Sequence, residues 1–211
     1  RLFRAIGFKA KAMWVSLAFV IPLVMALFFL WSAASEQVDF ARSERDGLAY
    51  VRPTLKLLAA AQDRRHAAIH GDADLATRQD AVKTAFALVQ AKQAEFGKAM
   101  GLEKSFEALQ AAHDGVLAAP TGSNADQTFA AHSGYVEAIL TLISSIADGS
   151  QLALDPELQT YHQMNMSVLR GPVLAENEAR IRSLGTLVLA EGLKGRELSN
   201  ARRDQFVNWL A

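Results

Sequence analysis

The sequence lacks cysteine, and it lacks an excess of charge of either sign. No cysteine occurs among its 211 residues, which excludes disulfide bonds, thiol catalysis and cysteine-ligated metal sites together. The formal net charge is zero, because 22 basic residues balance 22 acidic ones, and no basic stripe follows Lys11. Proteins that bind nucleic acid present a positive face to the phosphates, so we expect no nucleic-acid partner.

Catalytic motifs are missing as well. The sequence contains no nucleophile elbow, phosphate-binding loop, metalloprotease motif or dinucleotide-binding fingerprint. His66 and His70 stand four residues apart, as two metal ligands on one helix do, but a closed zinc site needs four ligands and no third one is indicated. We therefore expect no enzymatic activity, no metal and no cofactor in this chain.

The most informative feature that is present is an uncharged segment from Ala12 to Ser35, between Lys11 and Glu36. As a helix its residues, about 24 in number, would extend over about 36 Å, enough to cross a hydrocarbon core of about 30 Å. The apolar region of a signal peptide is shorter, about 7–15 residues. Although Ala33 and Ser35 loosely resemble a cleavage site, we interpret the segment as an uncleaved anchor in contact with membrane lipid.

The charged residues on either side of the segment predict its orientation. Basic residues alone precede it, whereas acidic and basic residues are interleaved after it. By the positive-inside rule, residues 1–11 lie in the cytoplasm, residues 12–35 cross the membrane and residues 36–211 lie outside the cytoplasm. The chain begins with Arg1 and closes in an apolar helical pattern around Trp209. We therefore expect it to be part of a longer protein, with its outer domain truncated at the C-terminal end.

Residues 36–211 carry a helical pattern. Alanine and leucine dominate, apolar residues recur three and four positions apart, and the alternation typical of strands is missing. Long helices joined by short loops pack as antiparallel bundles. We predict an all-α fold in which one transmembrane helix continues into a four-helix-bundle-like sensor domain. The predicted helices are 36–70 with a break or bend at Pro53, 74–99 capped by Asp72 or Asp74, 102–118, 125–148 after the Pro120–Asn124 loop, one that opens at Asp155-Pro156 and breaks at Gly171-Pro172, 173–191, and a last one from Ser199.

Two segments stand out as motifs. The first is Gln62–His66, followed by Gly71-Asp72, and the second is Leu152–Asn165, followed by Gly171-Pro172. Both resemble the extracytoplasmic region of bacterial methyl-accepting chemotaxis proteins and related sensor histidine kinases. In that family the second segment commonly reads as a Leu-x-Leu-Asp-Pro start, an Asp-Ser-Tyr-Tyr-Leu-Met-Asp-like run and a Leu-Pro break. This chain matches at Asp155, Pro156, Leu158, Tyr161, Met164 and Pro172 and departs at Gln159, His162, Gln163 and Asn165.

The resemblance implies the sensory portion of a transmembrane chemoreceptor in the bacterial inner membrane. Such a receptor is a homodimer, and it signals by helix displacement when a small molecule or a liganded periplasmic binding protein binds. The input domain of a sensor histidine kinase stays open as an alternative, since only the cytoplasmic parts separate the two classes. A membrane-anchored helical scaffold without a sensory role stays open as well. The departures from the family pattern weaken the transfer of ligand chemistry more than that of the fold.

The first candidate ligand-binding residues are Gln62 and Arg65, which continue the apolar stripe of the first predicted helix. A polar group on such a face is costly unless it has a partner. Either Arg65 binds a small anion such as a carboxylate through its forked donors, or it pairs with an acidic residue of another helix or of a second subunit.

The remaining candidates are two pairs. His113 and His132 lie on the stripes of the third and fourth predicted helices, near the same layer of an antiparallel pair. They form either a polar, pH-sensitive pocket or two core histidines with satisfied hydrogen bonds. Tyr161 and His162 lie in the second motif, where they either line a cavity or pack between helices.

Overall fold

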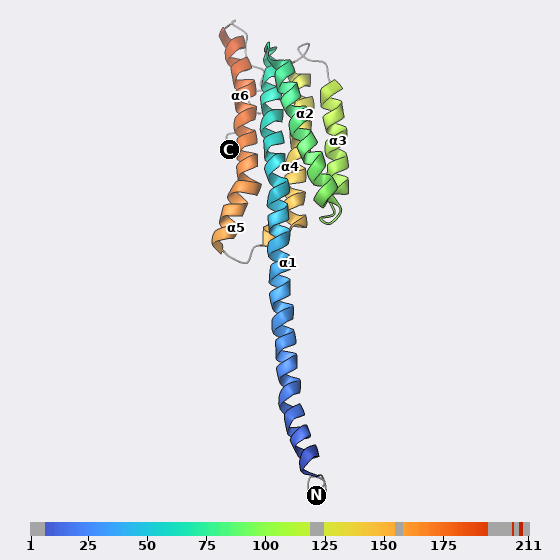
Figure 1. Ribbon diagram of the computed structural model, residues 1–211. Coiled ribbons are helices and arrows are strands. Elements are labelled where there is room, and N and C mark those ends of the chain that lie inside the picture. The colour runs from blue at the N-terminus through green and yellow to red at the C-terminus, as the bar shows by residue number, and fades with distance from the viewer. Residues whose placement is uncertain (1–6, 119–124, 155–157, 194–203, 205–206, 209–211) are drawn as a thin grey trace. The chain divides into compact units, whose positions relative to one another are not determined.

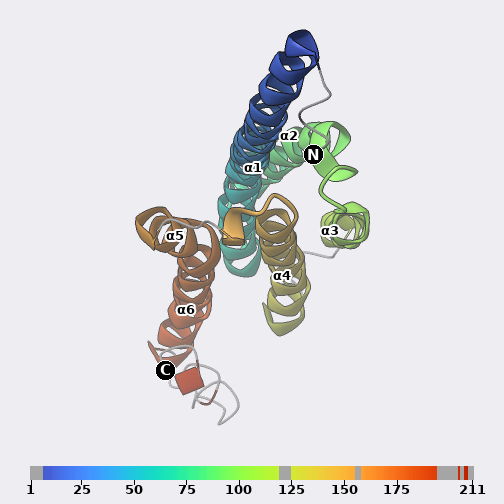
Figure 2. The same ribbon diagram turned by 90° about the horizontal axis from the view of Figure 1, so that it is seen from below.

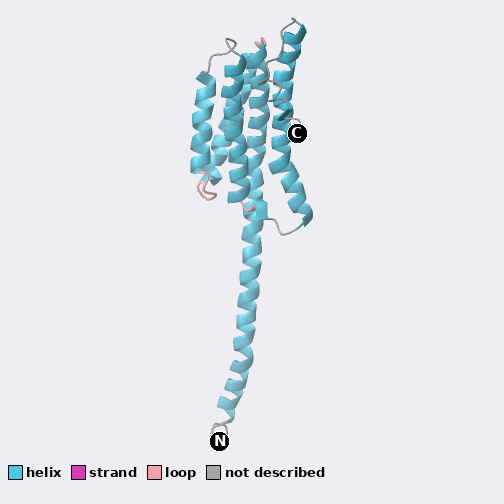
Figure 3. Ribbon diagram, turned by 180° about the vertical axis from the view of Figure 1, so that it is seen from behind, coloured by secondary structure: helices cyan, strands magenta, loops and turns pink. Residues whose placement is uncertain are grey.

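The computed structural model describes residues 7–118, 125–154, 158–193, 204 and 207–208. Throughout this part of the chain the regular elements are helices, without a strand, as Figure 3 shows. The prediction of an all-helical chain is therefore confirmed for these residues. The elements are α1 (Phe8–His70), α2 (Leu75–Lys92), the π-helix η2 (Gln93–Gly97), α3 (Glu103–Ala118), α4 (Ala125–Gly149), the 3-10 helix η3 (Leu152–Leu154), α5 (Leu158–Met164), the π-helix η4 (Asn165–Arg170) and α6 (Gly171–Leu193).

The chain divides into two compact units, residues 1–42 and residues 43–211. The described part of the first unit consists almost entirely of the N-terminal part of α1. Two helices, α1 and α4, are long and apolar enough to cross a membrane. None of the apolar window of α1 is buried, whereas 44% of that of α4 is. Part of the apolar window of α4 is therefore covered by protein, whereas that of α1 is exposed.

Helix α1 is unbroken from Phe8 to His70 although it contains two prolines. The predicted break at Pro53 does not occur, and the hydroxyl of Thr54 donates to the Tyr50 carbonyl oxygen in the same turn (2.9 Å). The helix ends as predicted at Gly71, which adopts a left-handed φ of 68°. The Asp72 amide then donates to the Ala67 carbonyl oxygen (3.0 Å), the bond that defines a Schellman ending.

In the second unit, helix α4 lies between α3 and α6, as the end-on view in Figure 2 shows. Its apolar face reads Val136, Ile139, Ile143 and Ile146, spaced three or four residues apart, and all four side chains are buried. The long helices of this unit run side by side in Figure 1. The buried core that they share contains Tyr50, Val51, Leu57 and Leu58 of α1, Val82, Phe86 and Val89 of α2, Phe106 and Leu109 of α3, and Met164 and Val168 of α5 and η4.

Two predictions about helix ends are wrong. Gly171-Pro172 does not break the chain, because α5, η4 and α6 follow one another without an intervening loop. The Gly171 amide donates to the Met166 carbonyl oxygen five residues earlier, so the chain passes through Gly171-Pro172 in a π-helical turn instead of a loop. Asp74 precedes α2 but makes no capping hydrogen bond, because its carboxylate binds Arg78 instead (2.9 Å). The Pro120–Asn124 loop, the Asp155-Pro156 start and most of the helix from Ser199 lie outside the described residues.

Candidate functional site

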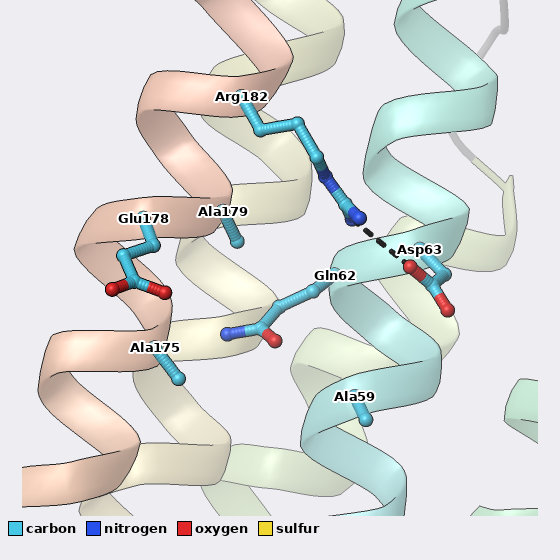
Figure 4. A pocket seen from close by; sticks show the side chains of 7 residues that line it. All are labelled: Ala59, Gln62, Asp63, Ala175, Glu178, Ala179 and Arg182. Carbon is cyan, nitrogen blue, oxygen red and sulfur yellow. Dashed lines mark hydrogen bonds and ion pairs between the residues drawn. The ribbon is translucent and has the colours of Figure 1, made fainter.

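A pocket lies between α1 and α6, as Figure 4 shows. Its volume is about 230 Å³. Three alanines leave this space because their side chains are short, namely Ala59 of α1 and Ala175 and Ala179 of α6. Its polar lining comes from both helices: Gln62 and Asp63 face Glu178 and Arg182. Arg182 is bound to Asp63 across the pocket (2.9 Å). We call this hollow the α1–α6 pocket.

Behind Gln62 lies a fully buried ion pair. The Arg65 guanidinium donates to both carboxylate oxygens of Glu176, Nη1 to Oε1 at 2.6 Å and Nη2 to Oε2 at 3.0 Å. Both side chains are almost completely buried, with exposures of 0% and 2%. Gln62 donates to the same carboxylate (3.1 Å), and Arg180 adds a contact from one turn further along α6. Of the two interpretations of Arg65, the structure places it with an acidic residue of another helix.

The neighbouring Arg64 is equally buried, at 1% exposure, but no carboxylate of the described residues forms an ion pair with it. Its Nη1 meets His132 Nε2 at 2.6 Å, and its Nη2 donates to the Val116 carbonyl oxygen at 3.2 Å. Val116 belongs to the last turn of α3, whose carbonyls lack partners within their helix and carry a partial negative charge. The end of α3 therefore takes the place of a counter-ion. Burial nevertheless lowers the pKa of Arg64 below its ordinary value.

Burial holds His132 neutral, and its two hydrogen-bond contacts fix its tautomer. Its Nδ1 lies 2.7 Å from the Thr128 carbonyl oxygen, which only accepts, so Nδ1 carries the proton. Nε2 is then the acceptor for Arg64. Burial lowers the pKa of His132 to about 4, and the positive charges of Arg64 and Arg65 lower it too, while the bond to Thr128 acts in the opposite direction.

His113 lies in a different polar contact from His132. Its Nδ1 is 2.9 Å from the Tyr135 hydroxyl, and its ring stacks on Phe86 with centroids 3.8 Å apart. Burial lowers the pKa of His113, and the charge of Arg64 contributes in the same direction. The two histidines are thus buried core residues with hydrogen-bond partners. The charge of Arg64 lowers the pKa of both.

Tyr161 and His162 lie on α5 and have different surroundings. Tyr161 packs against the core and lines a separate hollow between α4 and α6, whereas His162 is exposed. On α1, the rings of His66 and His70 are 4.5 Å apart. No cluster of three metal-ligating side chains exists among the residues that the structure describes.

The partners of the predicted residues were not predicted from the sequence. Arg64 stands directly before Arg65, and Glu176 lies on the buried face of α6 with Ala179 and Ser183. That spacing of three and four residues would have marked Glu176 as a polar residue on an inward face. Nothing in the sequence, however, specifies which helix it meets.

The chain matches no protein-family model, no curated protein and no solved structure.

Proposed function

We propose that this chain is the sensory portion of a transmembrane chemoreceptor. The main observation that supports this proposal concerns α1, which is helical without a break. It contains both the uncharged segment Ala12–Ser35 and Arg65, which forms a buried ion pair with Glu176 of α6. In this proposal residues 12–35 cross the inner membrane of a bacterium. Residues 36–211 form a periplasmic, four-helix-bundle-like sensor domain, the N-terminus is cytoplasmic, and the receptor is a homodimer. The resemblance of the Gln62–His66 and Leu152–Asn165 segments supports the receptor class.

The contacts between α1 and α6 suggest how a ligand would act on this domain. The interface holds one buried pair, Arg65 with Glu176, one exposed pair, Asp63 with Arg182, and the α1–α6 pocket beside them. Packed helix interfaces change between discrete arrangements rather than continuously, and buried polar pairs of this kind favour one arrangement over another. A ligand that bound one register better than the other would shift the population between them, and α1 would carry the shift toward the membrane.

This mechanism is tested by the distance between α1 and α6. Spin labels on Lys56→Cys and Glu178→Cys, in the full chain in lipid nanodiscs, report that distance by pulsed electron paramagnetic resonance. The chain has no native cysteine to interfere. Pools of organic acids, amino acids, sugars and amines are added in turn. We expect at least one pool to shift the distance distribution.

A label pair on Lys83→Cys of α2 and Lys104→Cys of α3 serves as the matched control, because both positions are exposed and neither belongs to the α1–α6 interface. Its distances should stay constant. A distribution between α1 and α6 that no pool shifts would contradict the sensory proposal and favour a helical scaffold.

A further inference from the structure

We propose that the hollow between α4 and the α5–η4–α6 segment binds a small monocarboxylate with an apolar body, and that Arg170 binds its carboxylate. This inference rests on the proposed sensory function and names the ligand class and the site. The hollow, which we call the α4–α6 groove, has a volume of about 550 Å³. Ligand-binding sites in proteins have volumes of about 300–1,000 Å³ and combine an apolar lining with a few polar groups. The groove has this size and this composition.

One of the two interpretations of Arg65 was that it binds a small anion, but its guanidinium is not free for a ligand. Both of its terminal nitrogens are bound to Glu176, and the pair is buried. Displacing that carboxylate would separate two buried charges and leave Glu176 with Arg180 as its cation, and breaking a buried ion pair is strongly unfavourable. An anion would therefore have to bind at another arginine.

Arg170 is such an arginine. It is exposed and is the one charged residue in the lining of the α4–α6 groove. Among the described residues, no carboxylate lies within ion-pair distance of its guanidinium, whereas Arg65, Arg78, Arg180 and Arg182 are all paired. A guanidinium presents two parallel donors that match the two oxygens of a carboxylate. One free cation in the groove favours a ligand with one negative charge.

The rest of the lining matches the body of such a ligand. Leu169, Val173 and Leu174 supply apolar surface, and Val173 and Leu174 are 48% and 58% exposed. Apolar surface of this kind gains about 25 cal/mol for each Å² that a ligand covers. The amides of Asn165 and Asn177 lie in the same lining and offer donors and acceptors that would orient the ligand.

The groove owes its polar lining to the π-helical turn η4. Asn165 and Arg170 are its first and last residues, and both line the groove. A Cβ atom on Gly171 would lie 2.5 Å from the Met166 carbonyl oxygen, so glycine is required for this turn. π-Helical turns inside longer helices occur frequently at functional sites. The Gly171-Pro172 sequence, predicted to end a helix, thus shapes the groove.

The test is isothermal titration calorimetry of the full chain in nanodiscs with phenylacetate and isovalerate, and with the uncharged phenylacetamide as a matched probe. We expect a carboxylate to bind and phenylacetamide to bind more weakly. Arg170→Gln should weaken carboxylate binding by about tenfold to a hundredfold, the value of one or two charge-assisted hydrogen bonds. It should leave phenylacetamide unaffected. Val173→Phe, which fills the groove at an exposed position, should weaken both probes.

Arg52→Gln is the control, because this exposed arginine lines neither the α4–α6 groove nor the α1–α6 pocket. It should leave carboxylate binding unchanged.

Equal carboxylate affinity in Arg170→Gln and the wild type would overturn the assignment of Arg170. Failure of both carboxylates to bind at millimolar concentration would overturn the ligand class. Binding that depends on Arg170 but leaves the distance between α1 and α6 unchanged would retain the site and refute the sensory function. If only ligands that do not need Arg170 shift the distance between α1 and α6, the sensory function is retained and the Arg170 site is refuted.

Discussion

Neutralising Glu176 should destabilise the domain more than any change at its surface. The Glu176 carboxylate accepts hydrogen bonds from Arg65, Gln62 and Arg180 and is 2% exposed. In Glu176→Gln the shape is kept, but the Arg65 guanidinium, with 0% exposure, loses its counter-charge. Removing one partner of a buried ion pair costs about 3–5 kcal/mol, because the other charge stays buried and unpaired. We expect the free energy of unfolding to fall by that amount.

The double variant Arg65→Met with Glu176→Met provides the decisive comparison. It removes both buried charges, and replacing such a pair by apolar side chains is often neutral or stabilising. Arg180 keeps its second partner, Glu137 (3.0 Å). The double variant should therefore be more stable than Glu176→Gln alone, although it contains more substitutions. The control is Asp63→Asn, which breaks an exposed ion pair with Arg182 and should cost at most about 1 kcal/mol.

The assay is urea unfolding of the full chain in mild detergent, followed by circular dichroism at 222 nm, a wavelength that reports helix content generally. Equal losses of stability in Glu176→Gln and Asp63→Asn would refute the reasoning, since they would mean that Arg65 is solvated or finds another partner. A double variant less stable than the single variant would refute it too, because it would show that packing rather than charge controls the site.

Two further predictions follow from the same contacts. Burial lowers the pKa of His132 from its ordinary value of 6.5 to about 4 in the folded state, so the unfolded chain binds more protons between these pH values. The stability present above pH 6.5 should therefore fall by about 3 kcal/mol as the pH drops to about 4, and pH-dependent urea unfolding should show a flatter profile in His132→Gln. Gly47→Ala should destabilise the domain by about 1–3 kcal/mol, since its Cβ would overlap the Ser150 side chain. Gly115 has open space around it, so Gly115→Ala should stabilise its helix by up to about 1 kcal/mol. Thermal unfolding measures both variants, and shifts of the melting temperature in the same direction would contradict the close packing at Gly47.

The helices could be predicted from the sequence because their signals are local. The end of α1 at Gly71 and the turn at Gly101 follow from glycine's tolerance of positive φ, and both residues adopt it, at 68° and 69°. Gly171-Pro172 misled the prediction, because proline lacks one donor and a π-helical turn compensates for that loss without ending the helix. Val168 of this turn is buried in the core, and such tertiary packing is not contained in a local pattern.

The candidate site could be predicted only in part. A polar side chain on an apolar stripe marks Arg65 as a residue that needs a partner, and the structure supplies Glu176 at a separation of 111 residues. Pairing over that distance depends on how α1 and α6 pack, so the sequence left both alternatives open. The burial of Arg64 could not be predicted, because its positive charge is balanced by a carbonyl oxygen at the end of α3 rather than by a charged side chain.

The most direct test of the account is the accessibility of single cysteines on the two sides of the uncharged segment. Lys9→Cys and Lys98→Cys both replace exposed residues in a chain without cysteine, and each variant is expressed in bacterial cells and treated with a membrane-impermeant maleimide before and after lysis. The account predicts that Lys98→Cys is labelled once the outer membrane is permeabilised, and that Lys9→Cys is labelled only after lysis. Labelling of Lys9→Cys from outside, protection of Lys98→Cys until lysis, or cleavage that removes Lys9 from the mature chain would contradict it.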